Sequence, residues 1–240
     1  MSFRFLPFQL KDIHQENKVL QPNGISSDNK ESCVILSDNS LLKSSLLFQA
    51  ALSYASIGDQ VIFICTGPFL AKPCPVSEMQ TATPLTLECI KMVYISEPSG
   101  LLQYLCELHT KECLPCAVIV HDIHHYVSHY TENTTKESSL IKLLAMLEDT
   151  AGFITRKKGD PCHRMVSLQK NFIPKNYLKR YFREIWDISL GEGAGEYFVT
   201  DNNVPAFRST IHINESREII CDNIYRLPQA REVEIDSHEH

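Results

Sequence analysis

The segment Ser37–Ser44 combines residue types and a spacing that could bind phosphate. It follows the apolar run Cys33–Leu36, and six residues separate that run from Lys43-Ser44, which is expected to open a helix. The phosphate-binding pattern G-x-x-x-x-G-K-[ST] has this layout: backbone N–H groups surround the phosphates, the lysine contacts them and the hydroxyl binds Mg²⁺. Lys43 and Ser44 are therefore candidate ligands of a phosphate group and its Mg²⁺.

Both glycines of that pattern are replaced, one by Ser37 and the other by Leu42. Glycine is favoured there because the loop uses positive φ angles and brings its N–H groups close to the phosphates. A non-glycine residue held at positive φ costs about 1–3 kcal/mol. Leu42 would also place a bulky side chain where the phosphate sits, and Asp38 would repel it. The alternative is an ordinary helix N-terminus with a solvated lysine.

Two later apolar runs end in polar side chains that could complete such a site. Val118–Asp122 ends in a carboxylate, and nucleotide-binding folds place an Mg²⁺-directed carboxylate at a strand end. The alternative is a strand-terminal Asp122 that caps the next turn. Met165–Gln169 ends in an amide, which by itself indicates only an ordinary strand end.

The elements that must position these residues follow from hydrophobic periodicity. Runs of apolar residues alternate with helical spacing, and the last segments alternate as a β-hairpin does. This order predicts an α/β domain with a mainly parallel sheet flanked by helices and a C-terminal antiparallel hairpin. The expected strands are 33–36, 60–65, 117–120, 165–168 and 185–188, the helices 44–57, 99–112, 138–153 and 176–183, and the hairpin 209–221. We expect a flexible leader at 1–30, one domain at 31–225 and an acidic tail at 226–240.

Composition excludes several classes of protein. With 43% hydrophobic and 22% charged residues, the chain of 240 residues is neither disordered nor fibrous. A net charge of −6 excludes a protein that coats nucleic acid through bulk positive charge. No apolar run reaches the roughly 18 residues that cross a membrane, and the start Met1–Phe8 is too short for a secretory signal. We expect a cytosolic or nuclear protein whose nine cysteines are mostly small buried residues.

Basic residues are concentrated between Thr155 and Arg183, which hold nine of them and one acidic residue. A single cationic face of this size would suit contacts with backbone phosphates, and interleaved aromatic side chains could stack on single-stranded bases. The alternative is a solvated basic face with Tyr181 and Phe182 in the core. The aromatic residues are Phe172, Tyr177, Tyr181 and Phe182, and the candidate DNA contacts are Arg156, Lys157, Lys158, Arg164, Lys170, Lys175, Lys179 and Arg180.

Cysteine and histidine residues gather between Cys113 and His129. The pair Cys113 and Cys116 precedes four histidines, and such a set can bind zinc. Cys116 adjoins a buried strand, however, and His124 and His125 are neighbours, which makes tetrahedral convergence difficult. We expect instead a polar loop beyond the sheet edge.

Taken in chain order, the Lys43-Ser44 helix start, Val118–Asp122 and Met165–Gln169 resemble the RecA-like recombinase family. Within it, the resemblance is strongest to the divergent paralogues that partner a SWIM-type zinc-finger protein in Shu complexes. It covers residues 31–222, and the other matching segments are Leu46–Ala51, Leu143–Ala151, Arg180–Phe182 and the hairpin Ser209–Cys221.

The resemblance implies a RecA-like P-loop NTPase core with ATP and Mg²⁺ as cofactors. By position, Lys43 would contact the β- and γ-phosphates, Ser44 and Asp122 would hold Mg²⁺, and Gln169 would sense the nucleotide and lead into a DNA-contacting loop. Cys65–Phe69 stands where recombinases place the glutamate that orients the attacking water. The sequence therefore does not predict hydrolysis.

The resemblance also implies a function: a nuclear factor of homologous-recombination repair that binds single-stranded DNA and supports a recombinase filament. Its implied partners are a SWIM-type zinc-finger protein, the recombinase and its paralogues. Two alternatives stay open at this point. One is an active small P-loop NTPase or kinase, which the altered phosphate loop disfavours. The other is a nucleotide-free scaffold subunit, which the basic stretch disfavours.

Overall fold

The structure is a computed structural model, and it describes Leu6 and residues 32–127, 135–201 and 207–226. Of the predicted leader it describes only Leu6, whose side chain is fully buried in the core. Of the predicted acidic tail it describes only Arg226, the end of a strand. The leader at 1–30 and the tail at 226–240 therefore stay predictions.

The described strands form one sheet in the order β3-β2-β4-β5-β1-β6-β7-β8-β9. The strands from β3 to β6 pair in parallel, and β7, β8 and β9 extend the sheet in antiparallel pairs. The expected mainly parallel sheet with a C-terminal antiparallel hairpin is confirmed. The strands are β1 Ser32–Leu36, β2 Val61–Cys65, β3 Ile90–Tyr94, β4 Ala117–Val120, β5 His163–Leu168, β6 Glu184–Leu190, β7 Glu196–Asp201, β8 Phe207–Ile213 and β9 Ile219–Arg226.

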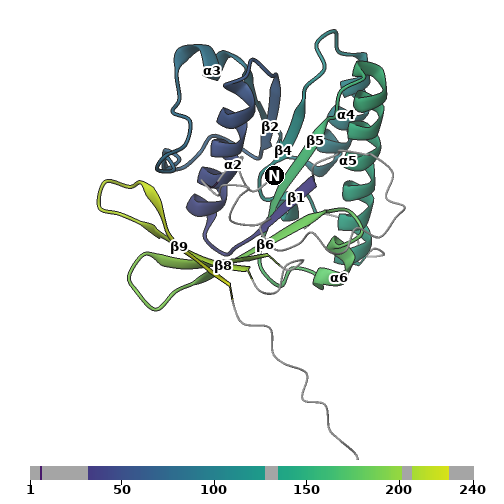
Figure 1. The fold of residues 1–240 in the computed structure, drawn as a ribbon. Coiled ribbons are helices and arrows are strands. Elements are labelled where there is room, and N and C mark those ends of the chain that lie inside the picture. The colour runs from purple at the N-terminus through teal and green to yellow at the C-terminus, as the bar shows by residue number, and fades with distance from the viewer. Residues whose placement is uncertain (1–5, 7–31, 128–134, 202–206, 227–240) are drawn as a thin grey trace, which may run out of the picture.

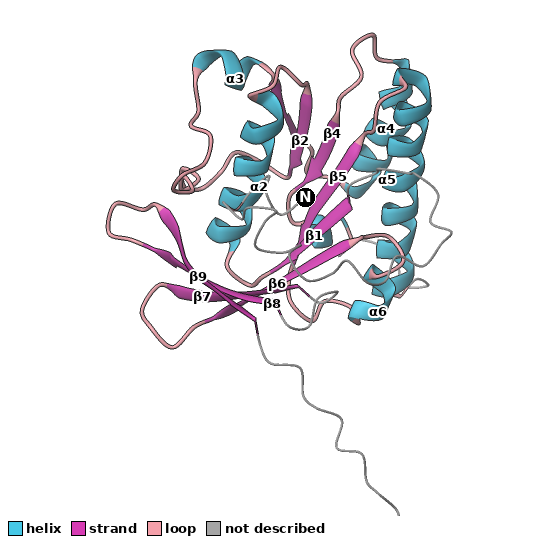
Figure 2. Cartoon of the chain, viewed as in Figure 1, coloured by secondary structure: helices cyan, strands magenta, loops and turns pink. Residues whose placement is uncertain are grey.

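Helices cover both faces of the parallel part of the sheet. Figures 1 and 2 show α2 and α3 on one face and α4 and α5 on the other. Side chains alternate along β1 accordingly, because successive residues of a strand point to opposite faces: Cys33 and Ile35 pack on the α2 side, and Val34 and Leu36 on the α5 side. The helices are α2 Ser40–Ala55, α3 Pro84–Glu88, α4 Pro98–Glu107, α5 Lys136–Lys158 and α6 Lys175–Leu178, with 3-10 turns η2 Leu108–Thr110 and η3 Ile123–Tyr126.

The elements α5, α6 and β7 differ from the sequence prediction. The helix α5 continues to Lys158 and ends at Gly159, whose positive φ of 81° terminates it as glycine commonly does. The helix expected over 176–183 is only four residues long, because the chain turns toward β6, where Tyr181 and Phe182 are buried. The strand β7 was not predicted. It pairs with β6, so the hairpin is part of a three-stranded extension.

The parallel strands place their following residues along one edge of the sheet. Ser37, which follows β1, donates its N–H to the carbonyl of Leu168 at 3.2 Å, and His121, which follows β4, donates to Ile64 at 2.8 Å. The ends of β1, β2, β4 and β5 therefore meet at this edge, where open α/β sheets place ligand sites. In the described part of the chain, no helix is both long and apolar enough to cross a membrane.

Candidate functional site

The connection between β1 and α2 has three residues, Ser37–Asn39, and not the six that the sequence predicted. Asn39 is the N-cap of α2, and its side-chain oxygen accepts a hydrogen bond from the N–H of Leu42 at 3.0 Å. Such a cap stabilises a helix by about 1 kcal/mol. The helix therefore begins at Ser40, and Lys43 and Ser44 lie within it and not at its start.

The prediction that the Leu42 side chain fills the phosphate position is wrong. Leu42 is fully buried and packs into the core beneath α2, so its side chain points away from any phosphate position. Neither Ser37 nor Leu42 has a positive φ. The strain expected from losing both glycines is therefore absent at these two positions, because the chain forms a short cap and not a loop that surrounds a phosphate.

Lys43 and Asp122 are brought together, and they bind each other. The Lys43 Nζ lies 2.5 Å from Asp122 Oδ1, with side chains only 3% and 6% exposed. Ser167 of β5 also donates its hydroxyl to Asp122 Oδ1 at 3.2 Å. Burial raises the pKa of Asp122, but the charges of His121 and Lys43 outweigh burial and hold that pKa below its ordinary value. The carboxylate is therefore ionised and neutralises Lys43.

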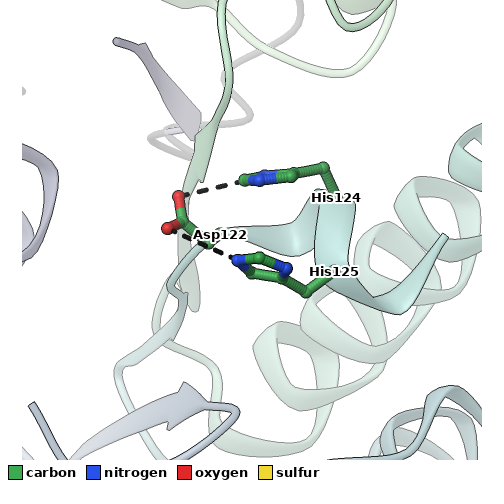
Figure 3. A group of neighbouring side chains, drawn as sticks. All are labelled: Asp122, His124 and His125. Carbon is green, nitrogen blue, oxygen red and sulfur yellow. Dashed lines mark ion pairs between the residues drawn. The ribbon is translucent and has the colours of Figure 1, made fainter. Parts of the chain in front are cut away.

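Three histidines surround the same carboxylate. His121 Nε2 lies 3.6 Å and His125 Nε2 3.9 Å from Asp122 Oδ2, and His124 Nδ1 lies 3.9 Å from Oδ1. Figure 3 shows the rings of His124 and His125 both directed at Asp122. Asp122 has a left-handed φ of 51°, which turns the chain from β4 into η3 and so aims these rings. Burial lowers the pKa of His121, and it lowers the pKa of His124 to about 4.

A cavity of about 340 Å³ opens beside this cluster. The end of β2 and the residues that follow it line this cavity as well, and burial raises the pKa of the thiol of Cys65, the last residue of β2, to about 11. The described residues that line the cavity are Ser40, Leu41, Ser44, Cys65, Thr66, Gly67, Pro68, Phe69, Leu70, Ala71, His121, Asp122 and His125. Among these described residues, Asp122 is the only carboxylate, and none of the others could activate a water as a carboxylate does.

The side chains that were expected to bind ATP and Mg²⁺ are not arranged to do so. Lys43 is engaged by Asp122, and the Ser44 hydroxyl donates to the Leu41 carbonyl at 2.9 Å within α2. Three connecting residues are too few to surround phosphate groups as the longer glycine-rich loop does. Gln169 is exposed directly after β5, at the same edge of the sheet. We derive no nucleotide-dependent step from this site.

The basic residues do not form the single face that the sequence predicted. Lys136, at the start of α5, has its Nζ 5.7 Å from the Phe172 ring centre, whereas Lys157, near its end, donates to the His109 carbonyl at 3.1 Å. At 1.5 Å per residue, about 30 Å of helix separates these contacts. Arg156, Lys157 and Lys158 therefore lie at one end of α5, whereas Lys170 and Lys175 lie toward the other end, at the strand-end edge of the sheet, where they contact Asp187. Arg183 lies back at the start of β6, where its N–H donates to the carbonyl of Ser32 at the start of β1. The two groups of cations are close in the sequence but not in space, because β5 crosses the sheet between Lys158 and Lys170.

Arg164 lies in the interior and not on a DNA-binding surface. Its guanidinium Nη2 donates to the Tyr181 carbonyl at 3.3 Å and lies 3.5 Å from Glu148 Oε1. The residue is 5% exposed, so it has no surface with which to contact a phosphate. Tyr181 and Phe182 are buried as well, which is the alternative left open for them, and Tyr177 is 40% exposed.

Residues Lys170–Arg183, here called the post-β5 segment, contain five basic residues and no acidic residue. Sequence reasoning missed the carboxylate that faces them. Asp187 of β6 lies 2.5 Å from the Nζ of Lys170 and also forms an ion pair with Lys175. Burial raises the pKa of Asp187, but the hydrogen bonds from the two lysines outweigh burial and lower it. A charged residue between the buried apolar residues Trp186 and Ile188 was the available signal.

The cysteines of the expected zinc alternative lie far from the histidines. Cys116 directly precedes β4 and His121 directly follows it, so the strand of four residues, about 13 Å long, separates them. Cys113 is exposed, and burial raises the pKa of the Cys116 thiol. His129 lies outside the described residues. The histidines therefore gather around Asp122 and not around the cysteines.

Comparison with solved structures places this geometry within a known fold. The RadB recombinase is 15% identical and aligns over 80% of this chain and 91% of its own, with a TM-score of 0.56. The flagellar accessory protein FlaH of Methanocaldococcus jannaschii is 11% identical over 80% and 89% of the two chains, with a TM-score of 0.53.

A KaiC-like protein of Pyrococcus horikoshii OT3 is 10% identical over 80% and 89% of the two chains, also with a TM-score of 0.53. No protein-family model and no curated protein sequence matches the chain. At these identities the likeness concerns the fold, and the expected fold class is confirmed: the chain has a RecA-like α/β fold.

Proposed function

We propose that this chain is a factor of homologous-recombination repair that binds single-stranded DNA without hydrolysing ATP. It would act in the nucleus and support the assembly or stability of a recombinase filament within a Shu-type complex, together with a SWIM-type zinc-finger protein. The RecA-like fold and the name of one similar structure, a recombinase, support the link to recombination. The observation that carries the proposal is the post-β5 segment, which concentrates five cations between the strand-end edge and the start of β6.

The exposed part of this segment suits a nucleic-acid backbone. Lys179, Arg180 and Arg183 are exposed, and the Arg180 guanidinium lies 5.9 Å from the Tyr181 ring centre. Tyr177 adds an exposed aromatic ring on the same segment, and a base that stacks on such a ring gains about 1–3 kcal/mol. Cations that alternate with an exposed ring are typical of surfaces that bind single strands without sequence preference.

The test compares charge reversal on the post-β5 segment with charge reversal at the end of α5. The double variant Lys179→Glu/Arg180→Glu should bind a fluorescent oligothymidine at least tenfold more weakly in an anisotropy titration. Its salt slope should fall by about 1.4, because each single-strand phosphate contact contributes about 0.7. The matched control Lys157→Glu/Lys158→Glu carries the same change of charge on the last turn of α5 and should retain most of the affinity. Equal losses in both variants would contradict a site on the post-β5 segment.

Nucleotide calorimetry on the purified complex separates the alternatives. We expect no ATP binding with or without single-stranded DNA, because the Lys43 ammonium group is already paired with the Asp122 carboxylate. ATP binding that is abolished by Lys43→Ala, in a variant that circular dichroism shows to be folded, would favour the active P-loop NTPase or kinase. If neither ATP nor DNA binds, the scaffold alternative is left.

A further inference from the structure

Asp122, His124 and His125 form a cluster that resembles a metal site. One potential ligand atom from each of the three side chains lies within 4.8 Å of the other two. His124 Nδ1 and His125 Nε2 are each 3.9 Å from an oxygen of Asp122. Figure 3 shows the two rings approaching the carboxylate from η3. Such convergence is unusual for side chains that serve only as packing.

The distances are close to those of a tetrahedral centre. Bonds of about 2.0–2.1 Å from Zn²⁺ to nitrogen or oxygen place neighbouring ligand atoms about 3.3 Å apart. The observed 3.9 Å runs from His125 Nε2 to Oδ2 and from His124 Nδ1 to Oδ1. A metal on Oδ2 therefore requires His125 to move inward by about half an ångström and the His124 ring or the carboxylate to turn toward it. His125 can make that movement, because its side chain is 53% exposed.

The carboxylate retains an oxygen for a metal. Lys43 and Ser167 both contact Asp122 Oδ1. Oδ2 has longer contacts, 3.5 Å from the Ser40 hydroxyl and 3.6 Å from His121 Nε2, and it can bind a metal because a carboxylate oxygen has two lone pairs. Asp122 and His125 both line the cavity described above, which gives a metal ion a route to the cluster and room for a water ligand.

We propose that Asp122, His124 and His125 bind a first-row transition-metal ion of the Zn²⁺ class, and not Mg²⁺. Two imidazoles and one carboxylate suit zinc, whereas Mg²⁺ takes oxygen ligands in octahedral geometry. Lys43 remains on the opposite oxygen, where it holds the carboxylate in place. The site goes beyond the proposed function and does not depend on DNA binding.

The test titrates the untagged full chain, stripped with a chelator, against Zn²⁺ in competition with a chromogenic chelator. We expect one Zn²⁺ per chain, at least tenfold weaker binding in His125→Ala, and unchanged binding in the control His109→Ala, which removes another exposed histidine. A hundredfold excess of Mg²⁺ should not displace Zn²⁺. Circular-dichroism melting of the metal-free His125→Ala variant should match the wild type, and His125→Gln provides a second variant if it does not.

Cobalt substitution identifies the ligands, because nine cysteines could also bind metal. The Co²⁺ form should show the visible bands of a site with nitrogen and oxygen ligands, and His125→Ala should lose them. Three results would overturn the proposal: a thiolate-to-cobalt charge-transfer band, equal affinities in wild type and His125→Ala, or displacement of Zn²⁺ by Mg²⁺.

Discussion

Two aspartates of this molecule bind lysines, and they do so in different surroundings. Asp122 and Lys43 are enclosed between α2 and the sheet, with almost no exposure. Asp187 binds Lys170 and Lys175 nearer the surface, with the carboxylate 17% exposed and the two lysine side chains 19% and 40% exposed. Removing one partner of a buried pair leaves an unpaired charge in the interior, whereas water can reach and replace a lost partner where a pair is partly exposed. The first contact therefore supports the fold, and the second is the more accessible of the two.

The largest effect should follow from Lys43→Ala. We expect the free energy of unfolding to fall by about 3–5 kcal/mol, because Asp122 is left charged and buried. Urea unfolding, followed by fluorescence of the single tryptophan, measures this change.

The double variant Lys43→Met/Asp122→Asn is the control for that experiment. It removes both charges and should recover much of the loss, because a pair replaced by neutral groups leaves no unpaired ion. A Lys43→Ala protein as stable as the wild type would show that the lysine is solvated and free to meet a phosphate.

A gain of function is expected from Asp187→Asn. The change removes the carboxylate that pairs with Lys170 and Lys175, so affinity for oligothymidine should rise and the salt slope should steepen, by about 0.7 for each phosphate contact that is added. Its stability cost should stay below about 1 kcal/mol, as for other partly exposed ion pairs. Anisotropy titrations between 50 and 200 mM salt measure the slope, and Asp160→Asn, at the far end of α5, serves as the neutral comparison. Weaker DNA binding by Asp187→Asn would mean that Asp187 positions the segment for DNA.

The smallest effect should be a dependence on acid pH. The pKa of Asp187 is lowered in the folded protein, so the unfolded chain binds its proton first as the pH falls. The stability that Asp187 contributes is complete above about pH 4 and is lost as the pH falls further toward the folded-state pKa. Urea midpoints at pH 5, 4 and 3 should fall more steeply in the wild type than in Asp187→Asn. Parallel curves would indicate that the two lysines do not hold the carboxylate in solution.

Local sequence patterns predicted most of the parallel core. The apolar runs at 33–36, 117–120 and 165–168 are strands, because an interior strand is apolar on both faces. The strand β7 was missed because its residues are half exposed and its apolar run, Tyr197–Val199, is short. The start of α2 was misplaced because Asn39 can serve either as a loop residue or as a cap, and only its contact with Leu42 distinguishes these roles.

By itself the sequence determined the RecA-like order of strands and helices, the position of Lys43 and Asp122 near strand ends, and the run of cations after Thr155. Tertiary structure alone decided which charges meet. Lys43 faces Asp122 because α2 packs beside β4, and Lys170 and Lys175 face Asp187 because the chain turns back into β6. The cations of 156–158 are separated from Lys170 and Lys175 because β5 crosses the sheet between them. Electrostatic partners depend on distance in space, which the spacing along a chain does not reveal.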